Sequence, residues 1–177
     1  IIVGQAARLP FSGRQRGPVP YKFEILCAII YEVMTTYADS SFLVAVYLIN
    51  IHSAKAAEMV QRIGQPLSFT VLNRLELRNA IHLSVFRKEI DVAKCMAAFK
   101  QIEEDIQEGR LIWVSIVWAD VYREAERLAD AHSATLGTRS LDILHVAAAR
   151  TLGATEFLTF DRRQAELAKS KGFTVRP

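Results

Sequence analysis

The sequence predicts an α/β protein of three layers, in which a short parallel sheet is flanked by helices on both faces. Two observations predict this class. Apolar segments of three to six residues alternate with longer segments whose apolar positions recur at helical spacing, and some of the longer segments end at a glycine. Strands that are separated by helices pair in parallel, because the crossover helix returns the chain to the same end of the sheet.

The elements can be assigned in chain order. Strands are expected at residues 35–38, 67–70, 111–116, 156–160 and 173–175. Helices are expected at 41–49, 53–64, 71–86, 89–109, 120–135, from Ser140 onward, and 162–172. Gly64 is the expected stop of the second helix, Thr70 the expected cap of the third, and Ser140 the expected cap of the helix that it begins.

The bulk composition is that of one folded domain. The chain has 177 residues, of which 51% are hydrophobic and 23% charged, which suffices for a sizeable core and argues against disorder. No apolar run approaches the roughly 18 residues that span a bilayer, and no signal-peptide cleavage pattern is evident. Cys27 and Cys95 form neither a disulfide framework nor a CxxC pair. We therefore expect a cytoplasmic protein without a membrane partner.

The first 33 residues differ from the rest. They are rich in Gly, Pro and Arg, show no sustained period, and carry +2 of the formal net charge of +3. The remaining chain is almost neutral, so any contact with a polyanion needs a local patch. Because Met34 stands directly before the first strand, we expect it to be the natural start. Residues 1–33 would then be an N-terminal extension of uncertain origin, and 34–177 a single domain.

Four acidic residues lie at or just beyond expected strand ends. Asp39 and Asp161 directly follow strands, Glu76 lies about one and a half turns into a helix, and Asp142 lies in the first turn of another. Since parallel strands end at one edge of a sheet, all four can converge there. Each also has a simpler explanation, as a helix cap, a first-turn acid or a solvated residue. The joint pattern, and the apolar neighbours of Asp142, favour a site.

Electrostatics predicts what such a cluster binds. Two carboxylates about 4 Å apart repel by roughly 4 kcal/mol at an effective dielectric near 20, so a cluster must take up protons or a cation. Ser41 and Thr159 offer further oxygens. The absence of HExxH and CxxC motifs disfavours zinc, whereas oxygen ligands suit Mg²⁺ or Mn²⁺. Metal-assisted phosphodiester hydrolysis is the reaction that fits.

Three stretches, "YADSSFL", "TVLNRLEL" and "LGTRSLDILHVAAARTLGATEFLTFDRRQAELAKSKGFTV", resemble the PIN-domain ribonucleases, specifically the VapC-type toxins of bacterial toxin–antitoxin pairs. The resemblance runs from about Met34 to the C-terminus. It implies a PIN-like fold and a Mg²⁺- or Mn²⁺-dependent endoribonuclease that leaves a 3′-hydroxyl and a 5′-phosphate. Its catalytic and metal-binding residues would be Asp39, Glu76, Asp142 and Asp161, with Ser41 and Thr159 in support.

Other polar and aromatic residues carry weaker expectations. Arg139, which lies in the matching "TRSLD", Arg162 and Arg163 are candidate phosphate contacts, although the last two are equally typical of solvated helix ends. His145 shares a helix face with Asp142 and is expected to be a half-buried, hydrogen-bonded histidine. The two tryptophans are expected in the core; they are Trp113 and Trp118.

The resemblance also implies partners, and it leaves alternatives open. The implied partners are the RNA substrate, a cognate antitoxin whose tail blocks the metal site, and a second copy of the chain in a homodimer. Surplus apolar helix surface agrees with protein partners. A catalytically silent PIN-like interaction module and a housekeeping RNA-processing nuclease are the alternatives. A receiver domain is disfavoured, because "YADSS" and "TFDRR" lack its paired acids and late lysine.

Overall fold

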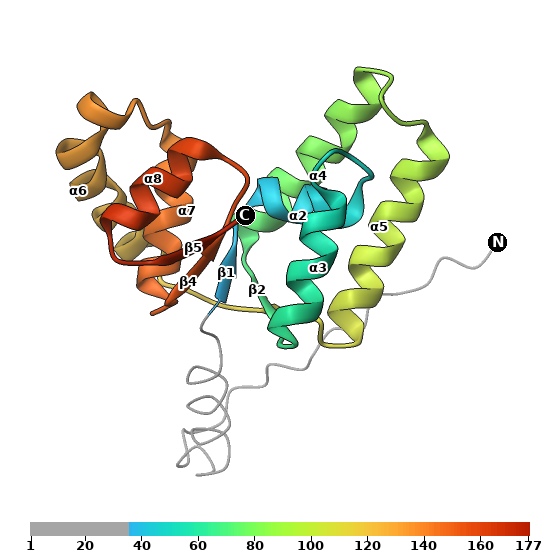
Figure 1. Cartoon of the computed structure of the whole chain (residues 1–177), viewed down its shortest axis with the longest axis horizontal. Helices are drawn as coiled ribbons and strands as arrows, with labels where there is room; N and C mark the ends of the chain where they lie inside the picture. Colours follow the sequence, from blue (N-terminus) through green and yellow to red (C-terminus); the bar gives the residue numbers. More distant parts are fainter. Residues whose placement is uncertain (1–35) are drawn as a thin grey trace, which may run out of the picture.

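A computed structural model describes residues 36–177 (Figure 1). The expectations about residues 1–33 and about Met34 as the natural start lie outside the described residues. Within them the elements follow in the order β1-α2-α3-β2-α4-α5-β3-α6-α7-β4-α8-β5. The predicted α/β class is confirmed, and every expected strand and helix is present.

The sheet has five strands, all paired in parallel, in the spatial order β3-β2-β1-β4-β5. The strands are short: β1 is Thr36–Ala38, β2 Leu67–Phe69, β3 Leu111–Trp113, β4 Glu156–Leu158 and β5 Thr174–Arg176. From β1 the chain moves outward to β2 and β3, then returns to the other side of β1 to form β4 and β5. The strand order therefore reverses between β1 and β4, and parallel sheets bind ligands beyond the carboxyl ends of strands at such a point.

Seven helices connect the strands. They are α2 Ser40–Tyr47, α3 Ser53–Ile63, α4 Val71–Phe86, α5 Val92–Gln107, α6 Trp118–Leu136, α7 Ser140–Thr151 and α8 Arg162–Ser170. Two of the predicted helix boundaries are confirmed. Gly64 ends α3 with a left-handed φ of 58°, and the Thr70 hydroxyl accepts a bond from the Asn73 amide at the start of α4.

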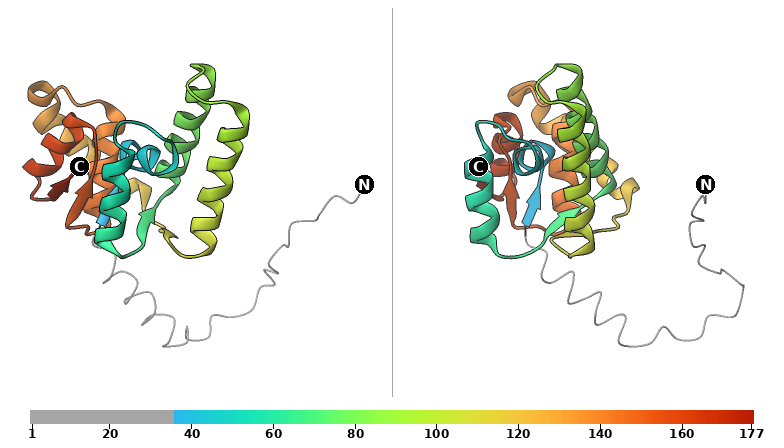
Figure 2. Two further views of the ribbon diagram at one scale, coloured as in Figure 1. Left: turned by 45° about the vertical axis from the view of Figure 1, so that its right-hand side comes forward. Right: turned by 90° about the vertical axis from the view of Figure 1, so that its right-hand side faces the viewer.

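The sheet separates two hydrophobic cores. On one face, α2 to α5 pack against residues such as Phe69 and Leu158; on the other, α6 to α8 pack against Tyr37 and Phe157. Figures 1 and 2 show the two groups of helices on opposite sides of the strands. The last two residues of β1 belong to different cores, Tyr37 to one and Ala38 to the other, so the residue that follows this strand starts from buried surroundings.

Two expectations need correction. Ser140 is the first residue of α7, and the cap position is held by Arg139. Trp113 is not a core residue: it is 41% exposed at the carboxyl end of β3, where its ring packs edge-on against Phe69 and the Arg74 guanidinium lies 5.7 Å from its centroid. An edge strand leaves one side of its last residue uncovered, which apolar character alone does not reveal. None of the helices within 36–177 is long and apolar enough to cross a membrane.

Candidate active site

Asp39 lies at the junction of β1 and α2 and is fully buried. It is the N-cap of α2, since its Oδ1 accepts a bond of 2.9 Å from the Phe42 amide. Its backbone amide donates to the Leu158 carbonyl of β4 over 3.0 Å, which continues the pairing of β1 with β4 by one residue. Local capping and sheet pairing thus fix this carboxylate at the point where the strand order reverses.

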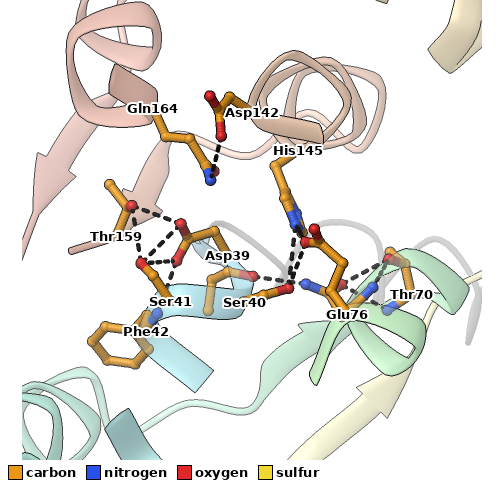
Figure 3. A network of polar contacts seen from close by, with 12 residues as sticks. Asp39, Ser40, Ser41, Phe42, Thr70, Glu76, Asp142, His145, Thr159 and Gln164 are labelled. Atoms are coloured by element: carbon orange, nitrogen blue, oxygen red, sulfur yellow. Dashed lines mark hydrogen bonds and ion pairs between the residues drawn. The ribbon is translucent and has the colours of Figure 1, made fainter. Parts of the chain in front are cut away.

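Two hydroxyl groups connect Asp39 to the end of β4 (Figure 3). The Phe160 amide donates to Ser41 Oγ over 2.9 Å, and Ser41 Oγ donates to both Asp39 oxygens over 2.8 and 2.9 Å. In parallel, the Asp161 amide donates to Thr159 Oγ1 over 2.9 Å, and Thr159 Oγ1 donates to Asp39 Oδ2 over 2.7 Å. Each hydroxyl accepts from a backbone amide and donates to the carboxylate, so Ser41 and Thr159 act here as supports for Asp39.

Burial raises the pKa of Asp39 above its ordinary value, although the nearby His145 and the bonds from Thr159, Phe42 and Ser41 act in the opposite direction. The carboxylate is therefore well supplied with donors, but no cationic side chain of residues 36–177 forms an ion pair with it. A cation placed next to it would offset the cost of its burial.

Glu76, on α4, belongs to a second polar network that spans the two halves of the molecule. Its Oε2 accepts a bond of 2.7 Å from Ser40 Oγ of α2 and contacts Nε2 of His145 on α7. On the opposite edge of the imidazole, Nδ1 lies 2.8 Å from the hydroxyl of Tyr37 on β1. His145 and Tyr37 are completely buried, whereas the Glu76 side chain is 20% exposed.

The chemistry of these groups determines which atom donates each hydrogen bond. A carboxylate only accepts, so Nε2 of His145 carries the proton that it shares with Glu76. Burial raises the pKa of Tyr37, which keeps its hydroxyl protonated and able to donate to Nδ1. Burial alone would raise the pKa of Glu76, but the hydrogen bond and electrostatic interaction with His145, together with the bond from Ser40, outweigh it and hold the pKa below its ordinary value. Glu76 is thus an anion whose Oε2 is engaged and whose Oε1 has no hydrogen-bond partner among residues 36–177.

Asp142 is buried in the first turn of α7. Its Oδ2 accepts a bond of 2.9 Å from the Arg139 amide and lies 3.9 Å from Nε of Arg163. Its Oδ1 is 3.4 Å from the side-chain nitrogen of Gln164 on α8. Despite its apolar neighbours, this aspartate is therefore turned toward polar groups at the start of two helices.

Asp161 is the N-cap of α8. Its Oδ1 accepts bonds of 2.7 and 3.1 Å from the amides of Arg163 and Gln164, while its Oδ2 has no hydrogen-bond partner in the part of the chain that the structure describes. The capping explanation thus holds for both Asp39 and Asp161, and it coexists with their place at one edge of the sheet.

All four predicted acids lie at the carboxyl edge: Asp39 and Asp161 at the β1–α2 and β4–α8 junctions, Asp142 in the first turn of α7 and Glu76 in the second turn of α4. Figure 3 shows three of them, Asp39, Glu76 and Asp142. Each is held by its own hydrogen bonds. As they are placed, no three His, Cys, Asp or Glu side chains within residues 36–177 form a group that could hold a metal ion. The four acids share the edge of the sheet that the sequence predicts. In this arrangement each keeps its own hydrogen bonds, and the four are not gathered around one ion position.

The predicted arginines are distributed around this edge. Arg163 lies next to Asp142, Arg139 is exposed at the cap position of α7, and Arg162 projects into solvent with its Nε 3.0 Å from Glu166. A cleft of about 440 Å³ adjoins Asp161; its lining includes His52, Lys55, Thr159, Phe160 and Arg162. The rings of His52 and Phe160 stack there at a centroid distance of 4.3 Å.

The sequence did not single out Tyr37, Ser40 or Gln164. His145 was expected to be half-buried and proves completely buried. One signal was available in the sequence: a histidine one turn after a buried aspartate, on a helix of alanines, needs polar partners from elsewhere in the chain. Which strands and helices supply those partners depends on strand order, which the sequence does not display.

Comparison with known proteins agrees with this fold. The family model described as the PIN domain matches residues 36–170. VapC20 of Mycobacterium tuberculosis, described as a toxin that cleaves the sarcin-ricin loop, superposes with a TM-score of 0.59 at 17% identity, over 80% of this chain and 99% of its own. PAE2754 of Pyrobaculum aerophilum superposes with a TM-score of 0.53 at 17% identity, over 81% of this chain and 83% of its own. No curated protein matched the sequence. The PIN-like fold and the resemblance seen in the sequence are confirmed.

Proposed function

Because the chain belongs to the PIN domain family, we propose that it is a metal-dependent endoribonuclease, and the toxin of a toxin–antitoxin pair. The observation that carries the proposal is the position of four carboxylates from four elements at the carboxyl edge of the sheet, one of which, Asp39, is fully buried and has a raised pKa. The fold similarity to a protein described as an RNA-loop-cleaving toxin supports the same class of substrate.

The donor atoms of the four acids are of the kind that a hard divalent cation prefers, and binding would require these side chains to move closer together than they lie in this structure. The donors on offer are oxygens of Asp39, Glu76, Asp142 and Asp161, and oxygen donors suit Mg²⁺ or Mn²⁺. The free Oε1 of Glu76 and Oδ2 of Asp161 can bind without breaking an existing bond. The raised pKa of Asp39 is the electrostatic signature of a carboxylate that a cation would stabilise.

The roles follow from these surroundings. Asp39, Asp142 and Asp161 would hold the ion, directly or through water, while Glu76 would be a further ligand or orient the attacking water. Ser41 and Thr159 keep Asp39 in place by donating to both of its oxygens. A bound divalent ion supplies a water of lowered pKa and neutralises charge on the phosphate under attack.

RNA would approach along the cleft beside Asp161. Lys55 and Arg162 line it and can meet phosphate oxygens, while the stacked rings of His52 and Phe160 offer an apolar face for a base. Arg139 and Arg163 lie beside Asp142 and complete the set of proposed phosphate contacts.

Protein partners have exposed apolar surface to bind. Ile49 and Ile51 after α2, and Phe86, Val92 and Met96 at the α4–α5 connection, are each at least 63% exposed. We assign these surfaces to the antitoxin and to a second copy of the chain in a homodimer. A catalytically silent interaction module is the second candidate, and it is favoured only if the acids prove dispensable.

Cleavage of RNA by the purified chain tests the proposal. Single-stranded RNA should be cut in Mn²⁺ or Mg²⁺, cutting should stop with a chelator, and Asp39→Asn combined with Asp142→Asn should abolish it. Asp130→Asn, the same change at an exposed position on α6, is the matched control and should cut normally. Cleavage that survives the double substitution would remove the acids from the mechanism. Folded protein that binds RNA without cutting it would favour the silent module.

The toxin assignment needs a test in cells. Controlled expression in bacteria should arrest growth, and co-expression of the adjacent small gene should relieve the arrest. Mapping RNA 5′-phosphate ends during arrest would identify the substrate. RNA cleavage in vitro without growth arrest would instead favour a housekeeping RNA-processing nuclease.

A further inference from the structure

Gln164 is a buried residue in the first turn of α8, with 7% of its surface exposed. Its side-chain nitrogen points to Asp142 Oδ1 at 3.4 Å, and its backbone amide donates to Asp161 Oδ1 at 3.1 Å. Gln164 therefore contacts two of the four acids, Asp142 through its side-chain nitrogen and Asp161 through its backbone amide. It was not among the residues that the sequence singled out.

The side-chain oxygen of Gln164 is buried and has no hydrogen-bond partner among the described residues. If the side-chain amide were flipped, its oxygen would face the Asp142 carboxylate and the two acceptors would repel each other. The amide is therefore oriented with its nitrogen toward Asp142. Buried polar atoms in folded proteins are nearly always bonded, to protein, water or an ion. An unpaired acceptor here calls for a donor or a cation that residues 36–177 do not supply.

The surroundings of this oxygen distinguish it from an ordinary packing defect. In Figure 3 the Gln164 amide points into the space between Asp142 and Asp39. The other orphaned buried side-chain atom of the described residues, Nε2 of His132, is a nitrogen on α6. An amide oxygen is a neutral ligand for Mg²⁺ and Mn²⁺, so it adds an oxygen to a crowded anionic site without adding a negative charge.

We propose that Oε1 of Gln164 is a fifth oxygen of the metal site, bound to the divalent ion directly or through one of its waters. This inference rests on the proposed function and deepens it. The side chain would then serve two purposes, because its nitrogen holds Asp142 while its oxygen faces the ion. A neutral amide suits this position better than a carboxylate for stability in the absence of metal, since Asp142 is in contact with it.

A purely structural role, in which Gln164 only holds Asp142, predicts different responses to substitution. Gln164→Met keeps the length of the side chain and removes both the donor and the acceptor. Gln164→Glu keeps an acceptor and removes the donor. If the oxygen binds the ion, Met weakens metal binding and Glu does not; if only the nitrogen matters, both weaken it.

The experiment is a titration of the full-length chain with Mn²⁺ alone, followed by calorimetry or by the electron paramagnetic resonance of free Mn²⁺. We expect Gln164→Met to raise the Mn²⁺ dissociation constant by about tenfold or more, the usual effect of losing a metal-site support. Gln164→Glu should bind at least as tightly as the parent. Gln61→Met, the same change at an exposed position on α3, is the control and should bind as the parent does.

The outcomes separate this inference from the proposed function. A parent chain that does not bind Mn²⁺ overturns the metal-dependent function and this inference with it. A parent that binds Mn²⁺, with Gln164→Met unchanged, overturns only the role of Gln164. Equal weakening in the Met and Glu variants assigns Gln164 to holding Asp142 and refutes a bond from its oxygen to the ion. Thermal melting without metal shows that each variant is folded.

Discussion

The contact between His145 and Glu76 makes a quantitative prediction about which atoms of the buried network matter for cleavage. Tyr37→Phe removes one hydroxyl, 2.8 Å from Nδ1 of His145, and keeps the ring that stacks on Phe157 at 5.6 Å. Nδ1 is then buried without a donor, which costs about 1–3 kcal/mol. Because 1 kcal/mol moves the melting temperature of a domain of this size by about 2–4 °C, we expect a fall of several degrees.

Cleavage should respond differently, because Nε2 of His145 still donates to Glu76 in the Tyr37→Phe variant. We expect a small change in kcat there. His145→Leu removes the donor and should lower kcat by about 10- to 100-fold, the usual cost of losing a group that orients a metal-site residue. His145→Gln places an amide nitrogen near the position of Nε2 and should restore much of the loss.

The assay is steady-state cleavage of a fluorogenic single-stranded RNA, at a temperature where each variant is shown by melting to be folded. The reasoning fails if His145→Leu cuts as fast as the parent, because Glu76 would then need no support. It also fails if Gln and Leu at position 145 are equally slow, or if Tyr37→Phe is as slow as His145→Leu.

Three further outcomes follow from the site and its caps. Asp39→Asn should raise the melting temperature of the metal-free chain, because it removes a buried charge of raised pKa, and should abolish the further rise on adding Mn²⁺. Melting from neutral pH to about pH 3 should show opposite effects of two acids. The pKa of Asp39 is raised in the folded state, so Asp39 contributes stability below its unfolded pKa, and this stability is lost as pH rises through its folded pKa. The pKa of Glu76 is lowered in the folded state, so Glu76 contributes stability above its unfolded pKa, and this stability is lost as pH falls through its folded pKa. Glu76→Gln should therefore melt with less sensitivity to acid than the parent, and Asp39→Asn should lose the decline toward neutral pH. Thr70→Ala should lower the free energy of unfolding by about 1 kcal/mol in urea, with Thr70→Ser close to the parent, because the hydroxyl caps α4.

The local features of the fold were predictable from the sequence because they depend on neighbouring residues. Helix α4 is an example: a capping threonine, a helical apolar period and the following break place it at Val71–Phe86, as expected. Placement of the four acids at one edge was also predictable, because it needs only the parallel pairing of strands. The error at Trp113 arose because exposure at an edge strand depends on which strand is outermost.

The polar partners of the acids were not predictable in the same way. Ser40 and His145 are 105 residues apart, and Ser41 and Thr159 are 118 apart. Their contacts depend on β4 lying next to β1, and a single sequence carries no direct signal of that neighbour relation. Gln164 escaped notice for a related reason, because a glutamine in the first turn of an amphipathic helix is ordinary until its burial is known.

Asp39 and Asp161 each cap the helix that follows them while facing the proposed site. Because each aspartate has both roles, the helix cap limits which substitutions the protein tolerates after it loses catalytic activity. Asparagine and serine preserve a helix cap, whereas alanine and leucine do not, so a duplicated copy that no longer needs to cut RNA can exchange either aspartate for an amide or a hydroxyl without losing the cap. We therefore expect catalytically inactive homologues to carry asparagine or serine at these two positions. A polar side chain other than a carboxylate there should mark a protein that keeps the fold but no longer cuts RNA.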